Sequence, residues 1–213
     1  MGRRALPKID PTVDLSRHLY MLDEMTAPFE QKEFFAVNRP LQVEIGSGKG
    51  LFIKNAALQF PDQNFIGIEI SKKYTRFAAY RLARDQIENA IMIAGDALRF
   101  MAEFVPPDSL AAVHVYFPDP WWKERHRKRR VMRESLIRDI ERTLRSGGEL
   151  HFWTDVREYF ETSLELIQQH SALDGPRAVE PKDPEHDLDY RTHFERRMRM
   201  HDQPVYRSLF VKK

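Results

Sequence analysis

The sequence of 213 residues contains no cysteine. The chain therefore has no disulfide framework, no cysteine-ligated metal or iron–sulfur centre and no thiolate nucleophile. Its N-terminal residues are polar and offer no apolar core for a secretory signal. Its apolar runs fall far short of the ~18 residues that span a bilayer, and no repeat of fixed period is present. These absences predict a cytoplasmic protein without a secretory signal, a membrane segment or a metal site.

The sequence also lacks a large excess of either charge, because 34 Lys and Arg residues face 32 Asp and Glu residues. This balance conceals a local asymmetry. Residues 123–133 hold seven basic residues and one acid, a net charge of +6, which leaves −4 for the rest of the chain. A run of charged residues often serves only to keep one face of a protein in water. This run, however, is dense and almost entirely positive. It predicts contact with the phosphates of a nucleic acid.

Strand-like and helix-like segments alternate about five times from Leu41 onward. Strands are predicted at residues 41–45, 64–70, 90–94, 110–117, 149–154 and 205–211, and the main helices at 51–60, 72–84, 134–144 and 156–170. This alternation predicts an α/β domain with a mostly parallel sheet and helices on both faces. We expect residues 1–38 to form an arm with one or two short helices, residues 39–213 the main domain, and residues 174–190 a mobile loop.

Ligands of parallel sheets bind at the carboxyl ends of the strands, and unusual residues stand at these ends. The first strand runs into Gly46-Ser47-Gly48-Lys49-Gly50, a turn that lets the backbone approach a nucleotide-like ligand. Glu69 ends the second strand, where a carboxylate can accept hydrogen bonds from both ribose hydroxyls. Asp96 follows the third and can accept one from an exocyclic amine. In this order they predict an adenosine site without a diphosphate group.

The fourth strand ends in Phe117-Pro118-Asp119-Pro120-Trp121, where two prolines restrict the backbone on either side of an acid. A carboxylate beside an aromatic side chain suits a flat ring that is held and hydrogen-bonded. A structural loop with a chance acid is the alternative. The fifth strand ends at Thr154-Asp155. The later residues 191–197 carry no signal of their own.

Together these residues resemble the bacterial tRNA (guanine-N7)-methyltransferase family, a branch of the class I S-adenosylmethionine-dependent methyltransferases. The blocks VEIGSGKGLFI, GIEIS, GDAL, FPDPWWKERHRKRR, FWTD and THFE occur in the family's order, from about Leu41 to Arg207. The fourth block is the most specific. The resemblance implies a Rossmann-like fold with a seven-stranded, mostly parallel sheet. It also implies methyl transfer from S-adenosylmethionine to N7 of guanosine 46 in the tRNA variable loop, with S-adenosylhomocysteine as the product.

The resemblance also implies roles for individual residues. Contacts to S-adenosylmethionine are expected from Glu44, Gly46, Gly48, Glu69, Asp96 and Asp119, and Asp119 is the expected catalytic residue. Substrate contacts are expected from Lys123, Asp155, Thr192, His193, Phe194 and Glu195, and RNA contacts from Arg125, His126, Arg127, Lys128, Arg129 and Arg130. The expected partner is tRNA, bound by a monomer or homodimer with no obligate protein partner. Trp122 and the N-terminal arm receive no role.

Three alternative functions remain. An amino methyltransferase of the adenine-N6 type has a loosely similar Asp-Pro-Pro-aromatic motif, but its order differs and the basic run has no place in it. A non-catalytic RNA-binding protein that retains a methyltransferase fold is disfavoured by the intact acids at successive strand ends. A nicotinamide dehydrogenase is disfavoured by the G-x-G-x-G spacing of the glycine loop, which differs from the dinucleotide-binding G-x-G-x-x-G pattern.

Overall fold

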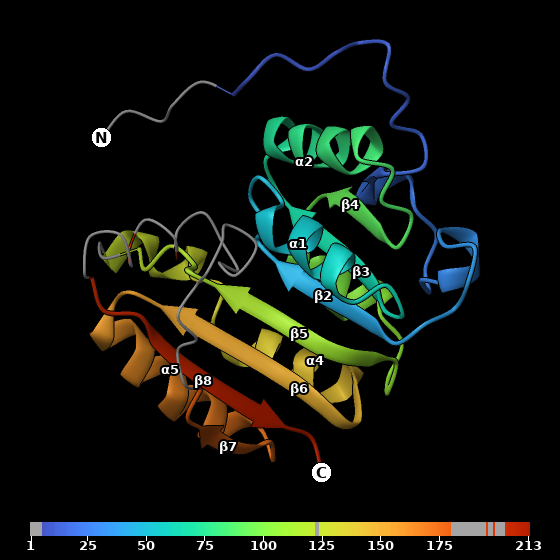
Figure 1. Cartoon of the computed structure of the whole chain (residues 1–213). Helices are drawn as coiled ribbons and strands as arrows, with labels where there is room; N and C mark the ends of the chain where they lie inside the picture. The colour runs from blue at the N-terminus through green and yellow to red at the C-terminus, as the bar shows by residue number, and fades with distance from the viewer. Residues whose placement is uncertain (1–5, 122–123, 180–194, 196–197, 199–202) are drawn as a thin grey trace.

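The computed structural model describes residues 6–121, 124–179, 195, 198 and 203–213. Their core is an eight-stranded sheet in the order β1-β4-β3-β2-β5-β6-β8-β7 (Figure 1). The six predicted strands are present as β2 (Leu41–Ile45), β3 (Asn64–Glu69), β4 (Ala90–Ala94), β5 (Leu110–Tyr116), β6 (Leu144–Thr154) and β8 (Tyr206–Val211). Strands β2 to β6 pair in parallel, and β8 pairs antiparallel with β6. The predicted α/β class is confirmed.

Two further strands, beyond the six that the sequence pattern predicts, bring the sheet to eight strands, whereas the family resemblance implied seven. β1 (Leu19–Met21) pairs in parallel with β4, and β7 (Asp174–Arg177) pairs antiparallel with β8. β7 lies where we expected a mobile loop, so that expectation is wrong for its first residues, and residues 180–190 lie outside the described residues. The arm also contains two short 3-10 helices, η1 (Leu22–Glu24) and η2 (Gln31–Glu33). Both added strands lie at sheet edges and are too short to produce an alternating pattern.

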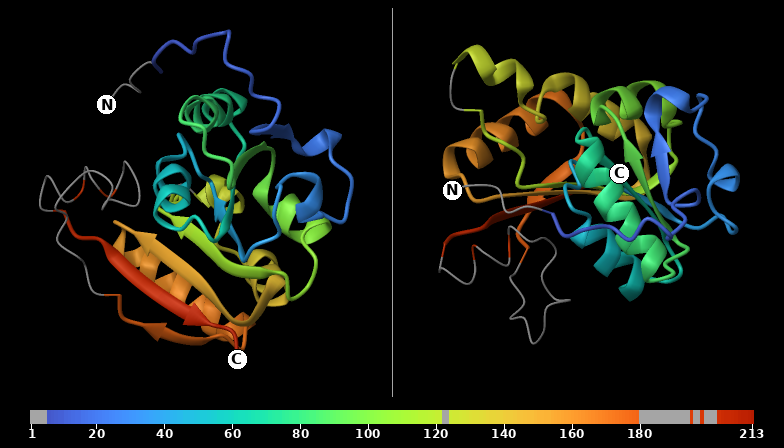
Figure 2. Two further views of the ribbon diagram at one scale, coloured as in Figure 1. Left: turned by 45° about the vertical axis from the view of Figure 1, so that its right-hand side comes forward. Right: turned by 90° about the horizontal axis from the view of Figure 1, so that it is seen from above.

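Helices cover both faces of the sheet (Figure 2). Helices α1 (Leu51–Gln59) and α2 (Lys72–Arg84) pack on one face, where their apolar side chains join Phe65, Ala90 and Met92 in one cluster. The other face carries α3 (Ala97–Arg99), the π-helical turn η3 (Phe100–Phe104), α4 (Glu134–Thr143) and α5 (Arg157–His170). Every residue of β4 is buried because both of its faces are covered. This explains why the central strands are continuous apolar runs.

The strand order reverses its direction between β2 and β5. Strands β3 and β4 follow β2 towards one side of the sheet, while β6 follows β5 towards the other. In open α/β sheets this switch point, at the carboxyl ends of the strands, is where ligands bind. The glycine loop after β2 and the Pro-Asp-Pro loop after β5 therefore meet at the predicted ligand edge. We call this side of the sheet the carboxyl edge and the opposite side the amino edge.

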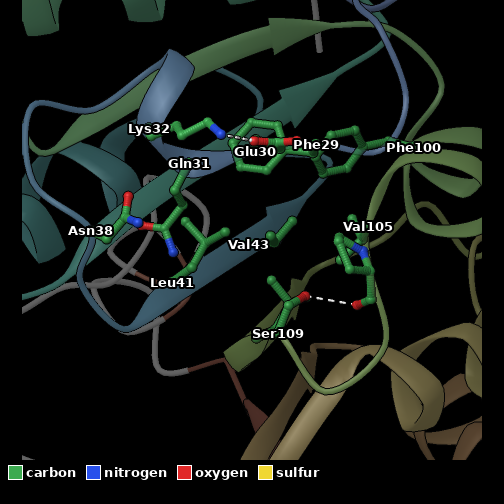
Figure 3. Close-up of a pocket in the computed structure, with 12 residues that line it drawn as sticks. Phe29, Glu30, Gln31, Lys32, Asn38, Leu41, Val43, Phe100, Val105 and Ser109 are labelled. Atoms are coloured by element: carbon green, nitrogen blue, oxygen red, sulfur yellow. Dashed lines mark hydrogen bonds and ion pairs between the residues drawn. The ribbon is translucent and has the colours of Figure 1, made fainter.

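A cavity of about 280 Å³ lies at the amino edge of the sheet. Figure 3 shows the residues that line it. Its walls come from the segment around η2, the beginning of β2 and the turn before β5. Most of its lining is apolar, including Phe29, Leu41, Val43, Phe100 and Val105. Some of its polar groups bond to one another, since Lys32 pairs with Glu30 and the Ser109 hydroxyl donates to the Pro106 carbonyl at 2.7 Å. The cavity therefore does not form part of the predicted site.

Candidate functional site

The glycine loop after β2 is shaped by its backbone. Gly46 and Gly48 have φ angles of +75° and +54°, in the left-handed region that favours glycine. The amides of Gly46 and Ser47 both donate to the Ile68 carbonyl, at 2.9 and 3.1 Å. A Cβ atom added at Gly46 or Gly48 would meet nothing within 4 Å, so these glycines serve the turn and face open space. A ligand can therefore approach the backbone closely at this point.

Glu69, at the end of β3, connects three loops of the carboxyl edge. One of its carboxylate oxygens accepts a hydrogen bond from the Gly48 amide at 3.0 Å, and the other accepts one from the Ser71 amide at 2.8 Å. Its backbone carbonyl accepts from the Gly95 amide at 3.1 Å. Each carboxylate oxygen can accept a second hydrogen bond, so the group retains capacity for the two hydroxyls of a ribose.

Glu44, in β2 beneath the glycine loop, is a buried acid with an unsatisfied oxygen. The residue is 3% exposed, and its Oε2 atom has no hydrogen-bond partner among the described residues. Burial, reinforced by the negative charge of Glu69, raises the pKa of Glu44 well above its usual range. A buried carboxyl group without partners is unfavourable, and a cationic or hydrogen-bond-donating ligand group would relieve it. The predicted donor, S-adenosylmethionine, carries both kinds of group.

Asp96 occupies the turn after β4, as the sequence predicts, and its side chain is exposed. Its Oδ1 atom accepts a hydrogen bond from the Leu98 amide at 2.9 Å and so caps α3. The structure thus gives Asp96 a capping role beside the predicted contact to an exocyclic amine.

The loop that carries Asp119 is held in a strained conformation. Phe117 and Trp121 have φ angles of +50° and +43°, which non-glycine residues rarely adopt. The Phe117 amide donates to the Trp153 carbonyl at 2.8 Å, and Arg130 Nε donates to the Pro120 carbonyl at 2.7 Å. Asp119 is exposed between these two attachments. Its position is therefore fixed by the loop, while its carboxylate stays accessible.

The basic segment follows as the 3-10 helix η4 (Glu124–Arg129), and it packs against the same loop. The Arg129 guanidinium lies 5.1 Å from the centre of the Trp121 ring, and the His126 ring meets that ring edge-on at 5.5 Å. The Arg130 guanidinium lies 5.2 Å from the ring of Tyr159 in α5. Arg130 therefore braces the Asp119 loop, whereas Arg125 and Arg129 are exposed. Of Arg127 and Lys128 only the backbone is described.

Glu195 forms a buried ion pair with Arg207 that the sequence does not predict. Arg207 Nη2 lies 3.1 Å from Glu195 Oε1, and the two side chains are 9% and 4% exposed. The Arg207 guanidinium also lies 4.8 Å from the centre of the Trp153 ring, which stands directly opposite it in the β6–β8 register. A cation over the face of tryptophan is a favourable arrangement. Arg207 thus attaches Glu195 to the end of β6.

Trp153 contacts or adjoins the segments that carry the three remaining acids of the site. Its carbonyl holds Phe117, two residues before Asp119, and its ring carries Arg207, the partner of Glu195. Asp155, which is half-buried, follows it by two residues. Lys123, Thr192, His193 and Phe194 lie outside the described residues. Arg207 could have been recognised as an arginine of the last predicted strand that lies opposite an aromatic residue of the neighbouring strand. Recognising it requires the register between β6 and β8, which the sequence does not give.

Within the described ranges, no group of three or more His, Asp or Glu side chains is placed to hold a metal ion. None of the helices described in the chain has the length and apolar character needed to cross a membrane.

Comparison with known proteins places the chain among methyltransferases. A family model described as "Putative methyltransferase" matches residues 38–208. The chain is 46% identical to a tRNA (guanine-N(7)-)-methyltransferase of Rhodopirellula baltica over 219 residues, which covers 100% of this chain and 81% of the relative. A protein of the same name from Oceanobacillus iheyensis is 30% identical, and the match covers 97% of each chain.

Solved structures agree on the fold. The 16S rRNA methyltransferase KamB matches with a TM-score of 0.62 at 14% identity, covering 91% of this chain and 99% of that one. The aminoglycoside resistance methyltransferase NpmB1 matches with a TM-score of 0.57 at 19% identity, covering 86% and 92%. At such low identity the likeness concerns the fold alone, and it confirms the predicted Rossmann-like methyltransferase architecture.

The buried Glu44 carboxyl predicts a specific pH dependence of stability. Because its pKa is raised, Glu44 keeps its proton to a higher pH in the folded protein than in the unfolded chain, which releases it near the ordinary glutamate pKa of about 4.3. The folded pKa is raised, so wild-type stability falls as the pH rises from that value towards the folded pKa. Glu44→Gln removes this loss and gains stability relative to wild type between about pH 4 and pH 8. Urea unfolding at both pH values measures the gain, and Glu88→Gln, at an exposed glutamate, is the control. An equal difference at the two pH values would contradict the prediction.

The ion pair between Arg207 and Glu195 predicts a non-additive pair of substitutions. Arg207→Gln removes the positive charge that is paired with the buried Glu195 carboxylate, and we expect a loss of about 3–5 kcal/mol in the free energy of unfolding. The double variant Glu195→Gln/Arg207→Gln leaves no buried charge, so most of this loss should be recovered. Denaturant unfolding of the wild type, both single variants and the double variant measures the coupling. Additive losses would show that the two side chains do not interact.

Proposed function

Because the chain belongs to the tRNA (guanine-N7)-methyltransferase family, we propose that its carboxyl edge brings the methyl group of S-adenosylmethionine to N7 of guanosine 46 in the tRNA variable loop. The protein is an S-adenosylmethionine-dependent methyltransferase, and the family membership that its sequence motifs predicted is confirmed. One observation supports this assignment of the site. The glycine loop with Glu44 and Glu69, and the loop with Asp119, follow strands that meet at the switch point between β2 and β5.

The residues around the glycine loop suit the methyl donor. Open space above Gly46 and Gly48 admits a ligand, and the Glu69 carboxylate can accept the ribose hydroxyls. Asp96 is placed to accept from the adenine amino group. The unpartnered oxygen of Glu44 favours a positively charged group nearby. S-adenosylmethionine supplies an electrophilic methyl group on a positively charged sulfur.

The reaction needs no general base. Guanine N7 carries an in-plane lone pair and no proton at neutral pH, so it can attack the methyl carbon directly. The N7–carbon bond forms as the carbon–sulfur bond breaks, no proton is transferred, and the positive charge moves from sulfur to the purine. The contribution of the protein is therefore mainly the alignment of the reacting atoms.

Three acids are held at the ends of β5 and β6; Asp119 is exposed, Asp155 is half-buried and Glu195 is buried in its ion pair with Arg207. We assign Asp119, Asp155 and Glu195 to the N1–H and amino donors of the guanine, opposite the edge that reacts. Their negative charge also stabilises the positive charge that develops on the purine. This electrostatic interaction accelerates the reaction only to the extent that it is stronger in the transition state than in the ground state. Asp119 is the catalytic residue of this proposal, since its strained and doubly attached loop holds it in place. Such preorganisation avoids reorganisation during the reaction.

The tRNA backbone is assigned to the basic segment. Arg125 and Arg129 are exposed beside the Asp119 loop and can reach phosphates, and Arg127, Lys128 and Lys123 follow the same assignment from the family resemblance. Thr192, His193 and Phe194 are assigned to the substrate on the same ground. The target base lies within folded RNA, so it has to be exposed before it enters the site. We further propose that the protein acts in the cytoplasm as a monomer or homodimer without an obligate protein partner.

A methyl-transfer assay tests this function. Tritiated S-adenosylmethionine is incubated with the protein and a tRNA transcript, and label is expected in the RNA. A transcript whose variable-loop guanosine is replaced by adenosine is the control and should receive no label. Borohydride and aniline treatment should then cleave the methylated tRNA at that position, because only 7-methylguanosine gives strand scission. Label without scission would support an amino methyltransferase instead.

The role of Asp119 predicts a rate effect without a change in the form of the pH profile. Asp119→Asn removes a negative charge beside the reacting purine, and we expect kcat/KM to fall about a hundredfold. The control is Asp108→Asn, at an exposed acid just before β5, whereas Asp119 follows the same strand at its other end. Asp108 lies at the amino edge, away from the site, where it pairs with Lys212, so we expect its substitution to leave the rate unchanged. A wild-type rate that rises about tenfold per pH unit across neutrality would demand a general base and contradict the mechanism.

A further inference from the structure

Helix α2 carries the second concentration of positive charge in the chain. It contains five basic residues and no acid, so residues 71–84 have a net charge of +5. Together with residues 123–133 they hold 12 of the 34 basic residues and one of the 32 acids. The rest of the chain keeps 22 basic and 31 acidic residues, a net charge of −9. Positive charge is therefore concentrated in two segments rather than one.

Two of the five basic residues of α2 are engaged within the protein. Arg81 donates to the Lys49 carbonyl at 3.2 Å, and Arg84 pairs with Asp85 at 2.7 Å. Lys72, Lys73 and Arg76 are exposed, and among the described residues none of the three has an ion-pair partner. We call these three side chains the α2 basic surface.

The α2 basic surface lies at the carboxyl edge, on the opposite side of the glycine loop from η4. Helix α2 begins three residues after Glu69, at the end of β3, whereas η4 follows β5. Strand β2, which leads into the glycine loop, lies between β3 and β5 in the sheet (Figure 1). Lys49 of the glycine loop continues the positive charge towards α2, since its Nζ atom lies 5.9 Å from the centre of the Tyr74 ring. Basic side chains thus flank the site on both sides.

The arrangement of these charges is unfavourable for the isolated helix. Lys72 and Lys73 stand in the first turn of α2, where the helix dipole favours acids, and that turn contains none. Lys72 and Arg76 are four residues apart on one face of the helix, so their like charges repel. A sequence that departs from local rules at exposed positions beside a site points to a role in binding. An anionic partner would relieve both penalties.

We propose that Lys72, Lys73 and Arg76 bind phosphates of the same tRNA whose target guanine enters the site, on the side opposite to the η4 segment. This inference rests on the proposed function. The RNA backbone continues on both sides of an exposed base, so phosphates are the anions that reach both flanks of the carboxyl edge. The two basic segments hold the RNA across the site, and the acids at the strand ends contact the base and the methyl donor between them.

Salt-dependent tRNA binding tests the α2 basic surface. The variant Lys72→Gln/Lys73→Gln/Arg76→Gln keeps good helix formers at all three positions. The matched control, Lys32→Gln/Arg145→Gln/Lys213→Gln, makes the same change of charge at exposed residues in η2, at the start of β6 and after β8, all at the amino edge. Dissociation constants are measured for wild type and both variants between about 50 and 200 mM salt.

For each lost phosphate contact the slope of log K against log salt should fall by about 0.7–0.9, so the α2 variant should lose about 2–3 in slope. The control should keep the wild-type slope. The α2 variant should also keep the wild-type affinity for S-adenosylmethionine and a thermal stability no lower than wild type. An unchanged slope, or an equal fall in the control, overturns the inference.

The two proposals fail in different ways. If wild type transfers methyl groups to tRNA while the α2 variant binds tRNA with the wild-type slope, the proposed function stands. The α2 basic surface then serves another anionic partner, such as an acidic protein face, and this inference is wrong. If wild type neither binds nor methylates tRNA, the proposed function fails and this inference fails with it.

Discussion

The hydrogen bonds of Glu69 are the interactions on which one half of the site depends, namely the loops after β2, β3 and β4 that are proposed to bind the methyl donor. The carboxylate of Glu69 joins the glycine loop to the first turn of α2, while its backbone carbonyl holds the turn that carries Asp96. Three loops that follow three different strands are thereby fixed relative to one another. A hydrogen-bonded acid at this point also contributes to the raised pKa of Glu44. The same carboxylate therefore holds the backbone of these loops and adds to the effect of burial on Glu44 beneath them.

The other half of the site is organised around Trp153. Its carbonyl restrains the loop that carries Asp119, and its ring supports Arg207, which holds Glu195. The two halves meet between β2 and β5, where the direction of the strand order reverses. One half is built from contacts within β2, β3 and β4, and the other from contacts among β5, β6 and β8. This division matches a reaction with two substrates, a methyl donor and a nucleic acid base.

The fold and the acids at the strand ends could be predicted from the sequence because both depend on local patterns. Continuous apolar runs identify buried parallel strands, and topology then places every following residue at one edge. β1 and β7 escaped prediction because edge strands of three and four residues are stabilised by pairing rather than by their own pattern. The contact of Arg207 with Glu195 and the left-handed backbone of Phe117 and Trp121 depend on tertiary register, which no local pattern encodes. The basic segment was predicted as one RNA-binding run, yet Arg130 also braces the Asp119 loop.

The antiparallel direction of β8 has a consequence for the order in which the site can form. A parallel strand delivers its last residue to the carboxyl edge, but β8 delivers its first residues, so Arg207 meets Trp153 from a segment 54 positions later in the chain. β8 is the last strand of the sheet in chain order, so this contact can form only after the rest of the sheet has been synthesised. During synthesis the strands that precede Glu69 and Asp96 therefore emerge from the ribosome well before β8. The part of the site proposed to hold the guanine is completed only when β8 joins the sheet, after the residues proposed to bind the methyl donor have been synthesised.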